Sequence, residues 1–435
     1  MVDFNFSNRS NILPFVAMEM MQKANVLKLK GIDIIHMDVG EPGFNTPSHV
    51  LNYLKTIITK SNFGYTEALG RPELREAISS HYKYWYKKNV DPECIGVTIG
   101  ASSAYVLSLL AVFDVGDKVG IMSPYYPAYI NALKALGIKV VVLEGDIDNS
   151  YQPTVSILKN YSNLKGLIIA SPANPTGSII NKSNMLDISK WCGKNNIRII
   201  SDEIYHGIEY ENRSNTFLSL NKNSIVINSF SKYFSMTGWR LGWIVAPKEI
   251  ISIIEKLSMA CFLCPPTISQ MAAIKVFDDY SELDINVSIY KKNRDLLVNV
   301  FEKIGLKNYA WELPEKLSGG MRQRAALART LLEDRPVVLM DEPFSALDAI
   351  TRLQLQEMAS ELLRDRTVML VTHDPLEALR LGNFIYLMTG RPAQLEKIAE
   401  LTDETPRDIN DPVILTHQAN LLTRMKNSIE NPSNE

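Results

Sequence analysis

The chain has 435 residues, of which 46% are hydrophobic and 22% are charged, and its formal net charge is -2. This length allows two or three domains with a large core, and the composition is typical of a globular protein in water. The nearly balanced charge gives no argument for nucleic acid or an anionic membrane surface as a partner.

The cysteines and the apolar runs of the sequence bear on disulfides, on metal binding and on where in the cell the protein is located. Four cysteines are too few for a disulfide framework. Cys261 and Cys264 form a CxxC in an apolar stretch without a second pair, which favours packing in the core, and we expect no metal site. The first residues lack the regions of a signal peptide, and no apolar run is long enough to span a bilayer. We therefore expect a cytoplasmic protein.

The chain order predicts helices that alternate with short strands. Small residues from Gly100 to Ser103 open an apolar helix that runs through Phe113. Free backbone N–H groups at such a start can bind an anion, although the same residues are common at ordinary helix N-caps. Other helices are expected at 14–30, at 47–60 and from Arg71, and strands at 32–39, 94–99, 118–122 and 139–143.

Three later strands, predicted at 166–170, 197–201 and 224–228, each run into polar residues. These are Asn174 after the first strand, Asp202 and Tyr205 after the second, and Lys232 after the third. Asn174 and Asp202 are 28 residues apart, and Asp202 and Lys232 are 30 apart, about one strand–helix–strand unit each. Ligands collect at the carboxyl ends of such strands, so we expect these side chains to converge on one crevice.

Each side chain alone has an ordinary alternative, because most lysines are solvated and most arginines pair with carboxylates. Together they suit pyridoxal phosphate, an electron sink held by a lysine imine, with an acidic partner for its pyridine nitrogen. Lys232 would hold the cofactor and act as general base, and Asp202 would keep that nitrogen protonated. The other predicted contacts are Asn174 and Tyr205 to the ring's phenolate oxygen, Tyr126 stacked on the ring, and Arg240, Ser229, Ala101 and Ser102 around the phosphate.

Residues 1 to about 305 resemble the class I/II aminotransferases of the fold-type I pyridoxal-phosphate family. The matching stretches are GYTEALGRPELREAI, SPYYPAY, SPANPTG, SDEIYHGIEY and SFSKYFSMTGWRLGW. The resemblance implies an α/β fold with a mostly parallel sheet between helices, and transfer of an amino group between an amino acid and a 2-oxo acid. It assigns the same cofactor residues, with Lys232, Asp202 and Tyr205 as catalytic. It adds Tyr65 on the cofactor phosphate of a neighbouring subunit, hence a homodimer, and Gly40 and Asn174 on the substrate.

The family's small domain, which supplies an arginine for the substrate carboxylate, does not follow. Instead, LSGGMRQR, PVVLMDEP, SALD and VTHD resemble the C-terminal half of an ABC-transporter ATPase over about residues 312–395. That resemblance places Ser318, Gly320 and His373 on the γ-phosphate of ATP, Asp341 near Mg²⁺, Glu342 near the attacking water, and Asp348 in the SALD motif. A GxxxxGK[ST] loop is absent from the sequence, so we expect no ATP turnover.

The ratio of lysine to arginine also changes near residue 312. Residues 1–311 hold 25 Lys and 7 Arg, whereas residues 312–400 hold 2 Lys and 9 Arg. We therefore predict a chimera. Its parts are an N-terminal arm with part of a small domain (1–45), a cofactor-binding large domain (46–281), a connecting helix and junction (282–311), a partial P-loop ATPase α/β segment (312–400) and a helical tail (401–435). Three alternatives stay open: an impaired aminotransferase, an incomplete importer ATPase associated with a transporter, and an inert fusion.

Overall fold

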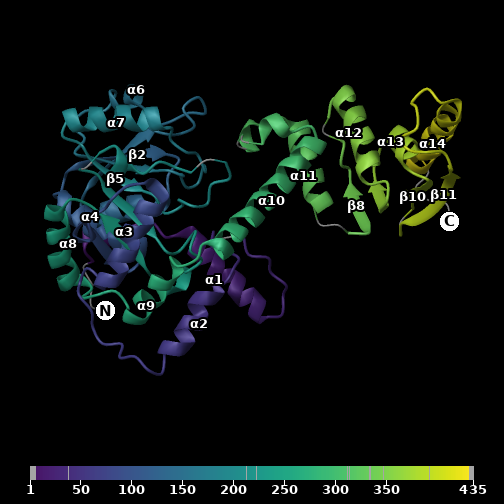
Figure 1. Ribbon diagram of the computed structural model, residues 1–435. Coiled ribbons are helices and arrows are strands. Elements are labelled where there is room, and N and C mark those ends of the chain that lie inside the picture. Colours follow the sequence, from purple (N-terminus) through teal and green to yellow (C-terminus); the bar gives the residue numbers. More distant parts are fainter. Residues whose placement is uncertain are drawn as a thin grey trace, which may run out of the picture. The chain divides into compact units, whose positions relative to one another are not determined.

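The computed structural model describes residues 6–37, 39–211, 213–221, 223–310, 312, 314–332, 335–345, 347–390 and 392–430. The chain divides into two compact units, Met1–Lys291 (unit 1) and Lys292–Glu435 (unit 2). The division lies inside the long helix α10 (Ser281–Lys303), which was predicted as the connecting helix (Figure 1). Each unit is described below by itself.

Unit 1 is built on a seven-stranded sheet in the order β1-β7-β6-β5-β4-β2-β3. The pairs from β6 to β3 are parallel, and β7 runs antiparallel to both β1 and β6. The mostly parallel α/β sheet predicted from the sequence is confirmed, but β7 was not predicted. The strands are β1 (Ile95–Thr98), β2 (Lys118–Ser123), β3 (Lys139–Glu144), β4 (Gly166–Ala170), β5 (Arg198–Asp202), β6 (Ile225–Ser229) and β7 (Gly242–Val245).

Helices cover both faces of this sheet, which explains why its strands are almost continuously apolar. Leu167 and Ile169 of β4 join one core with α3, α7 and α9, and Ile168 joins the other with α4, α5 and α8 (Figure 1). The helices are α1 (Val16–Leu29), α2 (Ser48–Ile57), α3 (Pro72–Tyr86), α4 (Gly100–Val112), α5 (Pro127–Ala135), α6 (Val155–Leu158), α7 (Lys182–Lys194), α8 (Lys248–Cys261) and α9 (Thr267–Val276).

Two predictions for unit 1 are wrong. Residues 32–37 and 39 form no strand, although their pattern predicted one, and Asp38 lies outside the described residues. A strand is stable only beside other strands, and this segment joins none of the sheets in the described part of the chain. Cys261 is exposed and Cys264 is half-buried, so Cys261 does not pack in the core. Helix α1 forms as predicted but buries none of its residues.

The described residues of unit 2 form two small sheets and three small cores. The parallel pair is β8 (Val337–Asp341) with β9 (Thr367–Val371), and the antiparallel pair is β10 (Phe384–Thr389) with β11 (Gln394–Glu400). We expected about three strands before residue 400, and the described residues contain these four. The helices are α11 (Gly319–Leu332), α12 (Ala349–Leu362), α13 (Pro375–Leu381) and α14 (Pro412–Glu430), the last being the predicted helical tail.

One face of the β8–β9 pair is open. Val337, Leu339, Met369 and Val371 are all exposed, Leu339 to 74%, and the register pairs Leu339 with Met369. On the opposite face Val338 packs in a core with Leu327. Parallel strands are normally covered by helices on both faces, so one face of this pair lacks the usual covering layer among the described residues.

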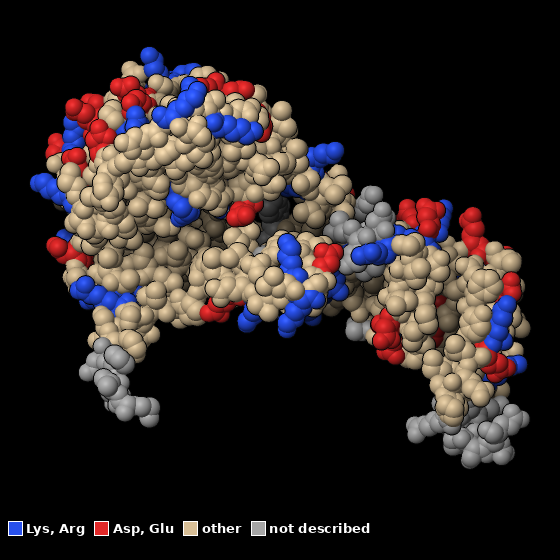
Figure 2. All heavy atoms as spheres, turned by 90° about the horizontal axis from the view of Figure 1, so that it is seen from below, with Lys and Arg blue, Asp and Glu red and all other residues tan. Residues whose placement is uncertain are grey.

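The surface carries mixed charge. Figure 2 shows Lys and Arg interspersed with Asp and Glu on the visible face, where no large block of one sign stands out. No helix in the described part of the chain is long and apolar enough to cross a membrane. The cytoplasmic location stays a prediction.

Candidate active site

The carboxyl end of β5 places a buried acid at the centre of the candidate site. Asp202 is the last residue of this strand and is almost wholly buried. Its Oδ1 accepts a hydrogen bond from the Ile204 N–H (3.0 Å), and its Oδ2 accepts one from the Tyr129 hydroxyl. Burial raises the pKa of Asp202, while the hydrogen bonds and the charge of Lys232 act in the opposite direction. The acid is therefore held in place and lies within electrostatic reach of an amine.

That amine, Lys232, follows the end of β6 by three residues. Its Nζ donates to the Gly40 carbonyl oxygen (2.5 Å) and lies 5.8 Å from the centroid of the Tyr205 ring. Burial lowers the pKa of Lys232; the carboxylates of Glu41 and Asp202 oppose this shift. An amine with a lowered pKa is a better nucleophile and base near neutral pH. The predicted acid thus ends one strand, the predicted lysine follows the neighbouring strand, and their charges act on each other.

Two further predicted side chains meet beside them. Asn174 Nδ2 donates to the Tyr205 hydroxyl oxygen (3.2 Å), which joins the loop after β4 to the loop after β5. Burial raises the pKa of Tyr205 to about 12, so its hydroxyl stays protonated at neutral pH. Tyr126, just before α5, meets Phe15 edge to face at 5.9 Å. The ring is half-buried, and its stacking on the ligand stays a prediction.

A cationic cradle forms at the start of α4. A Cβ atom built on Gly100 would lie 2.9 Å from Nη2 of Arg240, so the guanidinium rests against the first turn of this helix, which includes Ala101 and Ser102. The Ser229 hydroxyl, at the end of β6, donates to the Leu241 carbonyl oxygen (3.3 Å). A guanidinium at a helix N-terminus is a good site for a phosphate.

These donors fit pyridoxal phosphate. A buried carboxylate suits a pyridine nitrogen, an amine with a lowered pKa suits an aldehyde, and the Arg240 cradle suits a phosphate. Most of the residues assigned to the cofactor from the sequence therefore follow the strands at one edge of this sheet, but Tyr65 does not. Tyr65 lies in the extended link before α3 with 86% of its surface exposed, and its contact with a neighbouring subunit stays a prediction.

Gly100→Ala is expected to weaken the binding of pyridoxal phosphate by roughly tenfold, or about 1.4 kcal/mol. Gly100 has φ +71°, and the new methyl group would also push the Arg240 guanidinium away from the helix start. Gly116→Ala is the matched control, since Gly116 also has positive φ (+92°) but nothing lies within 4 Å of its Cβ position. Fluorescence titration with the cofactor gives both dissociation constants, and equal values for the two variants would contradict the expectation.

Sequence reasoning missed Tyr129, although a signal was present. Tyr126 is the residue just before α5 and Tyr129 lies in its first turn, three residues later, a spacing that places both side chains on the same side of the helix start. Their rings meet edge to face at 5.5 Å. The hydroxyl of Tyr129 therefore reaches Asp202 from beside the ring predicted to stack on the ligand.

In unit 2 the ATPase-like motif residues lie at strand ends and helix starts. Asp341 ends β8. The next residue, Glu342, has φ +43°, and its Oε1 lies 3.1 Å from His373 Nδ1. Asp348 caps α12 by accepting from the Thr351 N–H (3.0 Å). At the start of α11, Ser318 Oγ accepts from the Met321 N–H (3.3 Å), and a Cβ on Gly320 would lie 2.8 Å from Thr351 Cγ2. Glu342 and His373 are thus brought together at the ends of two parallel strands.

Comparisons with known proteins agree with the geometry of unit 1. The family model described as aminotransferase class I and II matches residues 32–365. A valine–pyruvate aminotransferase of Mycobacterium tuberculosis is 36% identical over 307 residues, which cover 69% of this chain and 79% of that protein. An aspartate aminotransferase of Thermotoga maritima is 32% identical over 296 residues, 67% of this chain and 78% of that protein. A crystal structure of an aminotransferase from M. tuberculosis is 36% identical, with a TM-score of 0.67, and the match covers 70% of this chain and 80% of that one.

Proposed function

Because the chain belongs to the class I and II aminotransferase family, we propose that it binds pyridoxal phosphate at Lys232 and transfers an amino group between an amino acid and a 2-oxo acid. Enzymes of this family depend on this cofactor. The observation that carries the assignment of residues is the pair formed by the buried Asp202 at the end of β5 and the half-buried Lys232 after β6: Asp202, with its raised pKa, acts electrostatically on Lys232, with its lowered pKa.

The bound cofactor would supply the electron sink. Lys232 Nζ would attach the cofactor and then move a proton at the reacting carbon. Asp202 would hold the proton of the pyridine nitrogen, since its carboxylate is fixed from both sides by the Ile204 N–H and the Tyr129 hydroxyl. Asn174 and Tyr205 would orient the ring oxygen through the hydrogen bond that they share.

The other proposed contacts are those with the cofactor phosphate, with the substrate and with a neighbouring subunit. Arg240, Ser229, Ala101 and Ser102 would hold the phosphate. The Gly40 loop, already within reach of Lys232, would face the substrate. The exposure of Tyr65 supports a homodimer in which this ring reaches the neighbouring phosphate site, and sedimentation of the full-length chain as a monomer would contradict that.

We expect the site to bind the substrate carboxylate weakly, because no counterpart of the family's small-domain arginine was found in the sequence. We therefore expect poor affinity for the amino donor and slow turnover. The test is an absorbance spectrum of the full-length chain with pyridoxal phosphate, before and after L-valine or L-aspartate. Loss of the visible band with release of one 2-oxo acid per cofactor would support transamination. Absence of any band would refute the cofactor site, and a band that both amino acids leave unchanged would refute transamination.

We further propose that unit 2 is a partial ABC-type ATPase joined to the aminotransferase part, so that the chain is a chimera and any transporter association lies in this unit. The contact between Glu342 and His373 and the open face of β8 and β9 support this proposal. We expect ATP with Mg²⁺ to leave the melting temperature unchanged, because a nucleotide that does not bind cannot stabilise the fold. Stabilisation that depends on ATP concentration, or ATP hydrolysis, would contradict this expectation.

A further inference from the structure

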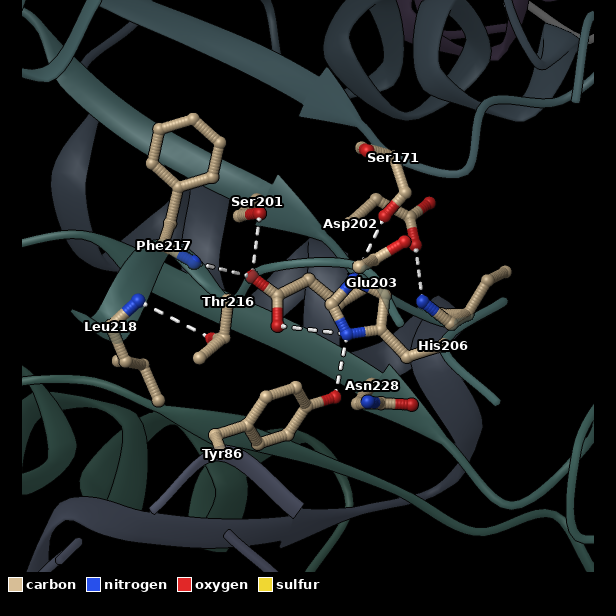
Figure 3. Close-up of polar contacts among 12 residues, drawn as sticks. Tyr86, Ser171, Ser201, Asp202, Glu203, His206, Thr216, Phe217, Leu218 and Asn228 are labelled. Atoms are coloured by element: carbon tan, nitrogen blue, oxygen red, sulfur yellow. Dashed lines mark hydrogen bonds and ion pairs between the residues drawn. The ribbon is translucent and has the colours of Figure 1, made fainter. Parts of the chain in front are cut away.

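A buried polar cluster lies behind the candidate site, on the loop that leaves β5. Glu203 and His206 flank Tyr205 on this loop, and only 1% and 3% of their surfaces are exposed. Figure 3 shows the carboxyl group and the ring facing each other, with Ser171 from the end of β4 and Tyr86 from α3 against the ring. Neither side chain was singled out from the sequence, and neither has a role in the chemistry proposed above.

The contacts of the ring define its tautomer. His206 Nε2 lies 2.9 Å from the Ser171 carbonyl oxygen, which can only accept, so Nε2 carries a hydrogen. Burial lowers the pKa of His206 to about 4, so the ring is neutral at pH 7 and its Nδ1 has no hydrogen. The Tyr86 hydroxyl therefore donates to Nδ1 (2.6 Å).

The two oxygens of Glu203 differ in their surroundings. Oε1 accepts hydrogen bonds from the Ser201 hydroxyl (3.0 Å) and the Phe217 N–H (2.9 Å). Oε2 lies 3.7 Å from His206 Nδ1 and has no hydrogen-bond partner within the described part of the chain. An ionised Oε2 would thus be buried without a hydrogen-bond donor in the described part of the chain, which is costly. Burial also raises the pKa of Glu203 to about 7.

We propose that Glu203 carries a proton on Oε2, facing His206 Nδ1, and that this uncharged pair positions Asn174 and Tyr205 for the cofactor ring. The inference rests on the proposed function. The pair acts through Ser171, whose N–H donates to the Asp202 carbonyl oxygen (3.1 Å) and whose carbonyl accepts from His206. Asn174 follows Ser171 by three residues, so the imidazole fixes one loop against the other.

The neutral state also protects the charge of Asp202. An ionised Glu203 would place a like charge on the adjacent residue, and a like charge disfavours ionisation. With the proton on Oε2, the charge on Asp202 remains available to the pyridine nitrogen. The other titratable or charged groups near the pair are Tyr82, Tyr86, His81, Glu209 and Arg213.

The test compares Glu203→Gln with Glu203→Leu, and Tyr86→Phe with His206→Leu. For each variant, absorbance titrations give the dissociation constant of pyridoxal phosphate and the apparent pKa of its visible band, neither of which depends on turnover. Glu203→Gln is expected to stay within about twofold of wild type, because a neutral amide keeps the site uncharged and its oxygen can still accept from the Ser201 hydroxyl and the Phe217 N–H. Glu203→Leu and His206→Leu are expected to change the dissociation constant about tenfold and to shift the band pKa by about one unit. Tyr86→Phe, which keeps the ring's shape, should shift the band in the same direction by a smaller amount.

The infrared spectrum of the cofactor-free chain at pH 6 tests the proton itself. A protonated-carboxyl band that disappears in Glu203→Gln is expected, and its absence from the wild-type chain would overturn the proposal whatever the cofactor does. The positioning role would be overturned if His206→Leu and Tyr86→Phe lowered only the melting temperature and left the band pKa unchanged. Damage by Glu203→Gln equal to that of Glu203→Leu would show that the charge is needed. A wild-type chain without a visible band would refute the proposed function and leave the infrared result to decide the proton.

Discussion

Lys232→Ala in the full-length chain is expected to abolish the visible absorption of bound pyridoxal phosphate and to slow amino-group transfer by about 10⁴-fold. The variant removes both the covalent attachment point and the group that moves the proton. Spectra and single-turnover release of the 2-oxo acid measure the two losses. Lys248→Ala is a suitable control, because Lys248 is exposed and pairs with Asp91 (2.8 Å) on the surface.

The same variant should not unfold the protein. Burial lowers the pKa of Lys232 in the folded chain, so the folded state holds the charged amine less well than the unfolded state does. Wild-type stability from this group therefore rises as the pH increases from below the folded pKa to the unfolded value, and Lys232→Ala removes that rise. A melting temperature equal to or above that of wild type at pH 7 is expected. A visible band that persists in Lys232→Ala would show that another amine holds the cofactor.

Much of the candidate site could be predicted because the sheet imposes it. Parallel strands end on one edge, so polar residues that follow successive strands must meet there, and Asn174, Asp202 and Lys232 do. The spacing of Tyr126 and Tyr129 indicated a shared side of the helix but not the partner of Tyr129. That partner and the contacts of His206 depend on which helix and loop pack behind that edge. Strand β7 was missed for a related reason: its four residues become a strand only through pairing with β1 and β6.

The N-terminal segment shows the opposite case. Residues 32–39 have the apolar pattern of a strand, and strand preference depends on neighbours rather than on the backbone alone. None of the described residues of this segment forms a strand, because the segment pairs with none of the sheets in the described part of the chain.

Asp202→Asn is expected to slow amino-group transfer by about 10³-fold. An amide cannot hold the pyridine nitrogen in its protonated form, so the ring would accept electrons poorly, while the Arg240 cradle would still bind the phosphate. Because burial raises the pKa of Asp202, the ionised carboxylate destabilises the cofactor-free fold as the pH rises above its unfolded pKa. The variant should therefore melt at or above the wild-type temperature without cofactor, and gain less from added pyridoxal phosphate.

A comparison with Tyr129→Phe distinguishes the effect of the Asp202 charge from its structural role as a hydrogen-bond acceptor. If Asp202 acts mainly as a structural acceptor for the Tyr129 hydroxyl, removing that hydroxyl should cost as much activity as Asp202→Asn. If its charge on the cofactor matters, Tyr129→Phe should slow transfer only about tenfold, because it removes one of the hydrogen bonds that favour the ionised acid. Transfer at the wild-type rate in Asp202→Asn would eliminate the acid from the mechanism, and with it the reason for a buried carboxylate beside Lys232.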